Sequence, residues 1–227
     1  MNFDYTYISL FGAIIFEPVT ILTNSLIGIY STFLFLKLQY FKHNYARQWA
    51  WFILFIGLGS LFGSIAHGTH YQLGVTFFKT IFYLMNAMSL ISVYFCFRAA
   101  FTYYTFSKQT YKKGVIYFVI AWISVLLIYT LIRNDFLIIK IHAGIVLIYS
   151  LIIHYIFYRK HDKGSGFIVL GIIVSFLSII VHTLKFSISE YFNYKDISHV
   201  IIVISLFIMY KGIKINSEKL NSASLTN

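Results

Sequence analysis

Apolar residues occur along this chain in seven long runs that are separated by short polar segments. Runs of about 20 apolar residues are typical of helices that cross the hydrocarbon core of a bilayer. We therefore predict an all-α, polytopic membrane protein with seven transmembrane helices, at residues 17–38, 48–70, 75–97, 114–132, 136–158, 165–185 and 196–213. The helices are expected to form one bundle over residues 1–215, followed by a polar, disordered cytoplasmic tail at 216–227.

The composition agrees with a membrane bundle and excludes a water-soluble globule. The chain is 59% hydrophobic and only 11% charged, whereas soluble domains carry about 25% charged residues. The net charge of +11 could indicate nucleic-acid binding, but the basic residues are scattered through short loops between apolar runs. We therefore expect the lipid bilayer as a partner and no nucleic acid. The single cysteine, Cys96, rules out an intramolecular disulfide.

The basic residues also predict how the bundle is oriented in the membrane. Most of the 18 lysines and arginines fall in the segments that follow the first, third, fifth and seventh spans. Loops that are rich in lysine and arginine stay in the cytoplasm. The N-terminus is therefore expected outside the cell and the C-terminus in the cytoplasm.

Histidines and carboxylates gather at the predicted outer side of the bundle. A helix rises about 1.5 Å per residue, so each residue's place in its span gives its depth. The outer group consists of His67, His70, His142, His182 and His199, together with Glu17, Asp135, Glu190 and Asp196.

Polar residues in six of the spans recur on one helix face. In the first span they are Glu17, Thr20, Asn24, Gly28 and Ser31, and residues at such spacings share a face. Polar groups within a bilayer must face the bundle interior or a watery cavity. The stripes therefore predict an outward-open polar pocket. The fourth span lacks a polar stripe, and we expect it to pack at the edge of the bundle.

Imidazoles on separate helices, with a carboxylate to orient them, are the groups that a catalytic zinc site needs. The predicted zinc ligands are His67, His182 and His199, with His70 and His142 as substitutes. Zinc-bound water ionises near neutral pH and can hydrolyse an ester or an amide. A simpler interpretation stands beside this one, because histidines at span ends commonly form interfacial hydrogen bonds.

Three further residues complete the predicted catalytic group. Glu17 or Asp196 would orient a ligand or act as general base, and Ser64 would steady the oxyanion. Each also has a purely structural interpretation. Glu17 stands before Pro18, which is favoured in the first turn of a helix, and serines within spans are usually packing residues.

Three segments resemble a bacterial family of multi-pass membrane proteins that brings no known activity. They are Glu17–Asn24, Gly63–Gly68 and Asp196–His199. The resemblance covers most of the chain and implies a location in the bacterial inner (plasma) membrane.

More distantly, a Ser and a His late in the second span, with a His in the seventh, are similar to the CREST superfamily. Here these residues are Ser64, His67 and His199. The superfamily contains the alkaline ceramidases and the adiponectin/progestin receptors, so the resemblance implies a zinc-dependent hydrolase of a lipid amide or ester. This chain departs from the pattern where a second seventh-span histidine is expected: Lys195 and Val203 stand at the two candidate positions.

Two hypotheses from different classes follow from the sequence. The first is a zinc-dependent membrane hydrolase that acts on a lipid or another amphiphile. The alternative is a non-enzymatic sensor, ligand-binding protein or small transporter, in which the histidines form a pH-responsive hydrogen-bond network. A third reading, haem held by two histidines, ranks last because no span has two histidines spaced to hold stacked haems.

Overall fold

The computed structural model describes residues 6–10, 12–69, 72–104, 109–133 and 137–225, and these form seven long helices and one short hairpin. Each helix is long and apolar enough to cross a membrane, which confirms the predicted all-α membrane fold. The helices are α1 (Pro18–Leu38), α2 (Asn44–Thr69), α3 (Gly74–Tyr103), α4 (Gln109–Arg133), α5 (Leu137–Tyr158), α6 (Lys163–Leu184) and α7 (Tyr194–Leu225).

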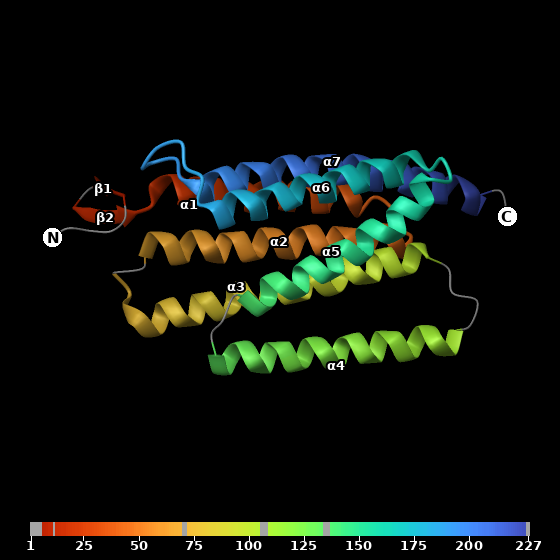
Figure 1. The fold of residues 1–227 in the computed structure, drawn as a ribbon, viewed down its shortest axis with the longest axis horizontal. Coiled ribbons are helices and arrows are strands. Elements are labelled where there is room, and N and C mark those ends of the chain that lie inside the picture. Colours follow the sequence, from red (N-terminus) through yellow and green to blue (C-terminus); the bar gives the residue numbers. More distant parts are fainter. Residues whose placement is uncertain (1–5, 11, 70–71, 105–108, 134–136, 226–227) are drawn as a thin grey trace.

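The helices run alternately up and down, so the two termini lie at opposite ends of the bundle (Figure 1). We name the two ends by one residue each. The Glu17 end holds the starts of α1, α3, α5 and α7, and the Asp162 end holds the starts of α2, α4 and α6. The positive-inside rule predicts that the Glu17 end faces outward, and this orientation stays a prediction.

The core lies between α1, α2, α3, α5, α6 and α7, and its largest side chain is Trp49, which is fully buried. Thr20, Asn24 and Ser31 of the predicted α1 stripe are buried, because the stripe faces other helices rather than lipid. Helix α4 packs against α3 at the edge of the bundle (Figure 1). This agrees with its lack of a polar stripe.

Helices α6 and α7 approach each other closely through glycines. A Cβ atom at Gly164 would overlap the Asn216 side chain, and one at Gly212 would overlap the Gly164 carbonyl oxygen. At Gly171 an added Cβ would collide with Met209. Small residues allow two membrane helices to pack backbone against backbone, so these glycines set the spacing of α6 and α7.

A β-hairpin precedes α1, and the sequence patterns did not predict it. Strands β1 (Tyr7–Leu10) and β2 (Ala13–Phe16) are antiparallel. Gly12 adopts a φ of 81° in the turn between them, a conformation that glycine adopts without steric cost.

The C-terminal end of α7 also differs from the prediction of a disordered tail from residue 216. Helix α7 continues to Leu225, and both Asn216 and Ser217 are fully buried. The Asn216 amide donates to Tyr45 Oη at 3.3 Å and to Ser165 Oγ at 3.4 Å. The polar side chain of Asn216 therefore has polar partners inside the bundle and is not exposed to solvent.

Candidate functional site

Glu17 occupies the junction between the hairpin and α1. Its backbone is left-handed, with φ 45°, and Pro18 follows as the first residue of the helix. Its N–H donates to the Thr6 carbonyl oxygen at 2.8 Å, and its own carbonyl accepts from Ile21 N at 3.0 Å. These contacts fix the residue so that its side chain, only 8% exposed, points into the bundle.

The Glu17 carboxylate binds one basic side chain from each of two other helices. Lys195 Nζ at the start of α7 lies 2.5 Å from Oε1, and His67 Nδ1 near the end of α2 contacts Oε2. Burial alone would raise the pKa of this carboxyl. The hydrogen bonds and charges of His67 and Lys195 outweigh burial and lower the pKa from its ordinary 4.5 to about 2. Glu17 is therefore ionised at every physiological pH.

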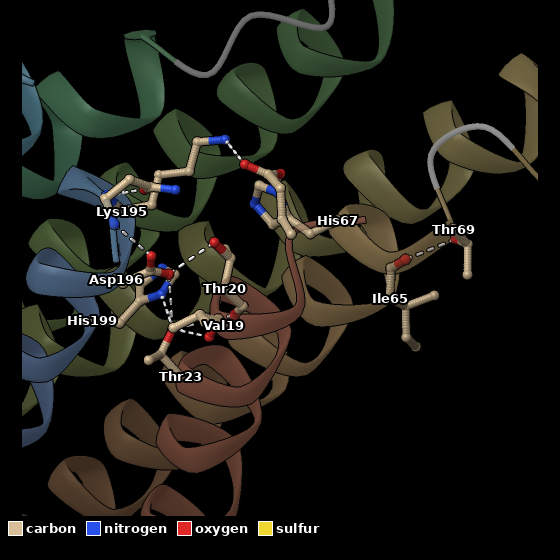
Figure 2. A network of polar contacts seen from close by, with 11 residues as sticks. Val19, Thr20, Thr23, Ile65, His67, Thr69, Lys195, Asp196 and His199 are labelled. Atoms are coloured by element: carbon tan, nitrogen blue, oxygen red, sulfur yellow. Dashed lines mark hydrogen bonds and ion pairs between the residues drawn. The ribbon is translucent and has the colours of Figure 1, made fainter. Parts of the chain in front are cut away.

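Asp196 lies beside this group and is fully buried (Figure 2). Its Oδ1 accepts hydrogen bonds from Thr20 at 2.8 Å and Thr23 at 3.4 Å, both on α1. Its Oδ2 accepts from Asn193 N at 2.8 Å, while Asn193 Oδ1 accepts from Lys195 N at 2.9 Å. This reciprocal arrangement is a capping box at the start of α7. Asp196 therefore starts α7 and also ties it to α1.

His199 follows one turn later on α7, and its Nδ1 lies 2.9 Å from Thr23 Oγ1. It interacts electrostatically with His67, His182, Lys195 and Glu17. His182, on α6, is placed by Tyr194, whose ring meets its imidazole edge-on at a centroid distance of 5.0 Å. One polar network therefore contains four of the predicted site residues, which are Glu17, His67, Asp196 and His199. Lys195, Thr20 and Thr23 connect them.

Other predicted site residues point elsewhere or lie outside the described chain. Ser64 Oγ donates to the Ile21 carbonyl oxygen at 3.1 Å and lies 3.0 Å from Ser25 Oγ. These contacts give it a packing role between α1 and α2. His142 is buried in α5, and its Nε2 has no hydrogen-bond partner among the described residues. His70 and Asp135 lie outside the described residues.

The predicted zinc ligands do not converge into a metal-holding group. Within the described ranges, no three His, Cys, Asp or Glu side chains are arranged to hold a metal ion. The ring of His67 is nevertheless oriented by Glu17 through Nδ1, as metal-ligating histidines are oriented by carboxylates. The residues thus supply one orienting contact but not the ligand set.

A second polar cluster lies at the Asp162 end, and the sequence patterns did not reveal it. Asp162 caps α6 through Ser165 N at 3.2 Å, and it also accepts hydrogen bonds from Tyr103 Oη at 2.8 Å and Lys219 Nζ at 3.2 Å. Burial would raise the pKa of this carboxyl, but the hydrogen bonds from Ser165, Tyr103 and Lys219 and the charge of Lys219 lower it.

The second cluster extends to a fully buried histidine. His154 Nδ1 lies 3.0 Å from Ser165 Oγ, which in turn donates to Asp162 at 2.5 Å. Since the hydroxyl proton of Ser165 goes to the carboxylate, His154 donates through Nδ1–H. The cluster joins α3, α5, α6 and α7. Its only sequence signal was the Asp162-x-x-Ser165 spacing of a helix cap.

The fold and the Glu17 cluster define an integral membrane protein with seven candidate spans and a buried ionic group at one end. The chain belongs to a family of unknown function, DUF6962, whose model matches residues 19–218. Comparison with curated proteins and with solved structures found no match. The more distant likeness to the CREST hydrolases therefore stays a prediction.

Proposed function

We propose that this protein is a non-enzymatic membrane sensor whose Glu17 cluster responds to protonation. The observation that carries the proposal is the double contact of the Glu17 carboxylate. Lys195 binds one oxygen through its ammonium group, whereas His67 binds the other through an imidazole, the side chain that pH switches in proteins commonly use. The strength of the junction between α1 and α2 therefore depends on pH, while the junction between α1 and α7 keeps its charges.

The surroundings of His67 support a response to protons. Its side chain is 29% exposed, so protons reach it from the aqueous side, whereas Glu17 is almost covered. Lys195 and His199 on α7 and His182 on α6 are the other basic side chains of the group. A proton on the imidazole of His67 would strengthen its attraction to the ionised Glu17 carboxylate.

A distance measurement between two spin labels tests this function. Cys96 is buried, so labels can be directed to cysteines introduced at Thr69 on α2 and Glu190 in the α6–α7 loop. We expect the distance distribution to become shorter or narrower as the pH falls from about 8 to about 5. The change should vanish in His67→Gln and persist in His161→Gln, which alters an exposed histidine at the opposite end. A response of equal size in His67→Gln would overturn the proposal.

The zinc-dependent hydrolase is the second candidate, and one observation favours it. Glu17 contacts Nδ1 of His67, and Thr23 contacts Nδ1 of His199. A metal would therefore be bound through the Nε2 atom of each ring. His182 would have to supply a third nitrogen, and a lipid amide or ester would be the substrate. Metal analysis of protein purified without a His-tag decides the matter. One zinc per chain that is lost in His67→Ala/His199→Ala supports this candidate, and a metal content unaffected by the substitutions rejects it.

A further inference from the structure

A cavity of about 470 Å³ lies at the turn between α5 and α6, far from the Glu17 cluster. It is lined by Tyr155, Tyr158, Arg159, His161 and Lys163. Helix α5 ends at Tyr158 and α6 begins at Lys163, and His161 makes the reversal with a left-handed φ of 64°. The tight turn places the basic side chains at the mouth of one hollow between two helix ends.

The lining of this cavity is cationic and has no carboxylate. Arg159 and Lys163 are permanent cations, and neither takes part in an ion pair among the described residues. The nearest acidic residue in sequence, Asp162, is turned inward and only 6% exposed. Its carboxylate forms an ion pair with Lys219 and accepts hydrogen bonds from Tyr103 and Ser165. The positive charge of the cavity is therefore not neutralised from within, and it favours an anion.

Two tyrosines supply the remaining wall of the cavity. Tyr158 lies against Gly166 of α6, where even a Cβ atom would come within 2.8 Å of the tyrosine ring. The absence of a side chain at Gly166 lets this ring cover the start of α6. Phenolic hydroxyls donate hydrogen bonds, and tyrosines are enriched at the level of lipid headgroups.

The apolar surface that continues from the cavity indicates a lipid rather than a soluble anion. On α5, Ile152 precedes Tyr155 and Arg159 by one and two turns and is exposed. On α6, Phe167 and Leu170 follow Lys163 by one and two turns and are exposed as well. Residues at these spacings share a helix face. A headgroup in the cavity would therefore have its acyl chains along an apolar strip of both helices.

We propose that this cavity binds the phosphate headgroup of an anionic phospholipid. Arg159 and Lys163 would bind the phosphate oxygens, the tyrosine hydroxyls would donate to the headgroup, and the α5–α6 strip would hold the acyl chains. Basic pockets between membrane helices are known to bind anionic headgroups. The site is independent of the Glu17 cluster, which lies at the other end of the bundle.

Lipid binding to the purified full-length protein in micelles, followed by native mass spectrometry, tests the site. Phosphatidylglycerol should bind more tightly than phosphatidylcholine with the same acyl chains. Arg159→Gln/Lys163→Gln should weaken phosphatidylglycerol binding roughly thirtyfold, because each of the two basic residues contributes about 1 kcal/mol. Lys42→Gln/Arg47→Gln removes the same charge from exposed positions at the same end and should leave binding within about twofold.

A second cavity variant and a competition experiment complete the test. Arg159→Gln/His161→Gln removes one cation and one imidazole of the cavity without altering α6, and it replaces the first variant if that variant unfolds in phosphatidylcholine micelles. Equal losses in the cavity variants and in Lys42→Gln/Arg47→Gln would overturn the proposal, since only overall charge would then matter. Inorganic phosphate that competes with phosphatidylglycerol at millimolar concentration would overturn the assignment to a lipid.

Discussion

Glu17 and Lys195 are 178 positions apart in the chain, yet the carboxylate oxygen of one lies 2.5 Å from the ammonium nitrogen of the other. The contact joins the first helix to the last at the Glu17 end. Because the Glu17 side chain is nearly covered and the Lys195 side chain is 19% exposed, the pair is shielded from water. The same carboxylate also binds His67, so three helices meet at one anion.

The first prediction concerns the energetic coupling of this pair. Removing Lys195 leaves the shielded Glu17 charge with His67 as its remaining partner, which costs more than removing both members of the ion pair. Lys195→Met should therefore destabilise the protein more than Glu17→Gln/Lys195→Met does. A double-mutant cycle of the free energy of unfolding, measured by detergent titration, should give a coupling of about 1–3 kcal/mol. Additive effects of the two substitutions would show that the contact contributes nothing.

The second prediction is an acid dependence caused by Glu17. Its pKa is lowered from 4.5 to about 2 in the folded protein, so the unfolded chain binds more protons between these values. The stabilisation is therefore fully present above about pH 4.5 and is lost as the pH falls toward about 2. In Glu17→Gln the unfolding temperature should fall less steeply across this window than in the wild type. Parallel curves for the two proteins would contradict this assignment.

The third prediction concerns the close approach of α6 and α7. Gly171→Ala should destabilise the protein by about 1–3 kcal/mol, because the added methyl group overpacks a filled interface. Gly144→Ala on α5 is the matched control, since an added Cβ there meets nothing within 4 Å. Alanine is favoured over glycine within helices by up to about 1 kcal/mol, so the control should be neutral or stabilising. Chemical unfolding of both variants measures the difference.

The fourth prediction separates the roles of Asp162. Asp162→Asn keeps an oxygen that caps α6 but loses the charge that pairs with Lys219, so it should cost about 1 kcal/mol. Asp162→Ala also removes the cap and leaves the hydroxyls of Tyr103 and Ser165 without an acceptor. It should cost about 2–4 kcal/mol. Unfolding temperatures that are the same for both variants would mean that the cap and the buried hydrogen bonds are dispensable.

The membrane fold was predictable because a spanning helix depends on the length of an apolar run, which one sequence displays directly. The edge position of α4 was predictable for a related reason, because a helix without a polar stripe has no row of polar side chains that must face the other helices. The hairpin before α1 was missed because four-residue strands are too short to give a periodic signal. The burial of Asn216 was not predictable from its polar side chain, because its partners Tyr45 and Ser165 belong to other helices and meet it only once the helices are packed.

The Glu17 cluster was predictable in part. Depth along each helix correctly grouped Glu17, Asp196 and His199 at one end, because helix rise is regular. Which atoms touch depends on how the helices rotate and approach, and periodicity does not fix this to within a hydrogen bond. Lys195 was therefore noticed only as an interruption of a histidine motif, although it is the direct partner of Glu17.

The central claim is that the Glu17 carboxylate is sensitive to the charge of His67. Infrared spectroscopy of the carboxylate stretch tests it directly, since the chain has only seven acidic residues and the Glu17 band is identified by its loss in Glu17→Gln. Glu17 stays ionised throughout, so any shift of its band between about pH 8 and about pH 5 reports a change in its partners. The band is predicted to shift in the wild type and in His161→Gln but not in His67→Gln. A band that does not move in the wild type, or that shifts equally in His67→Gln, would contradict the account.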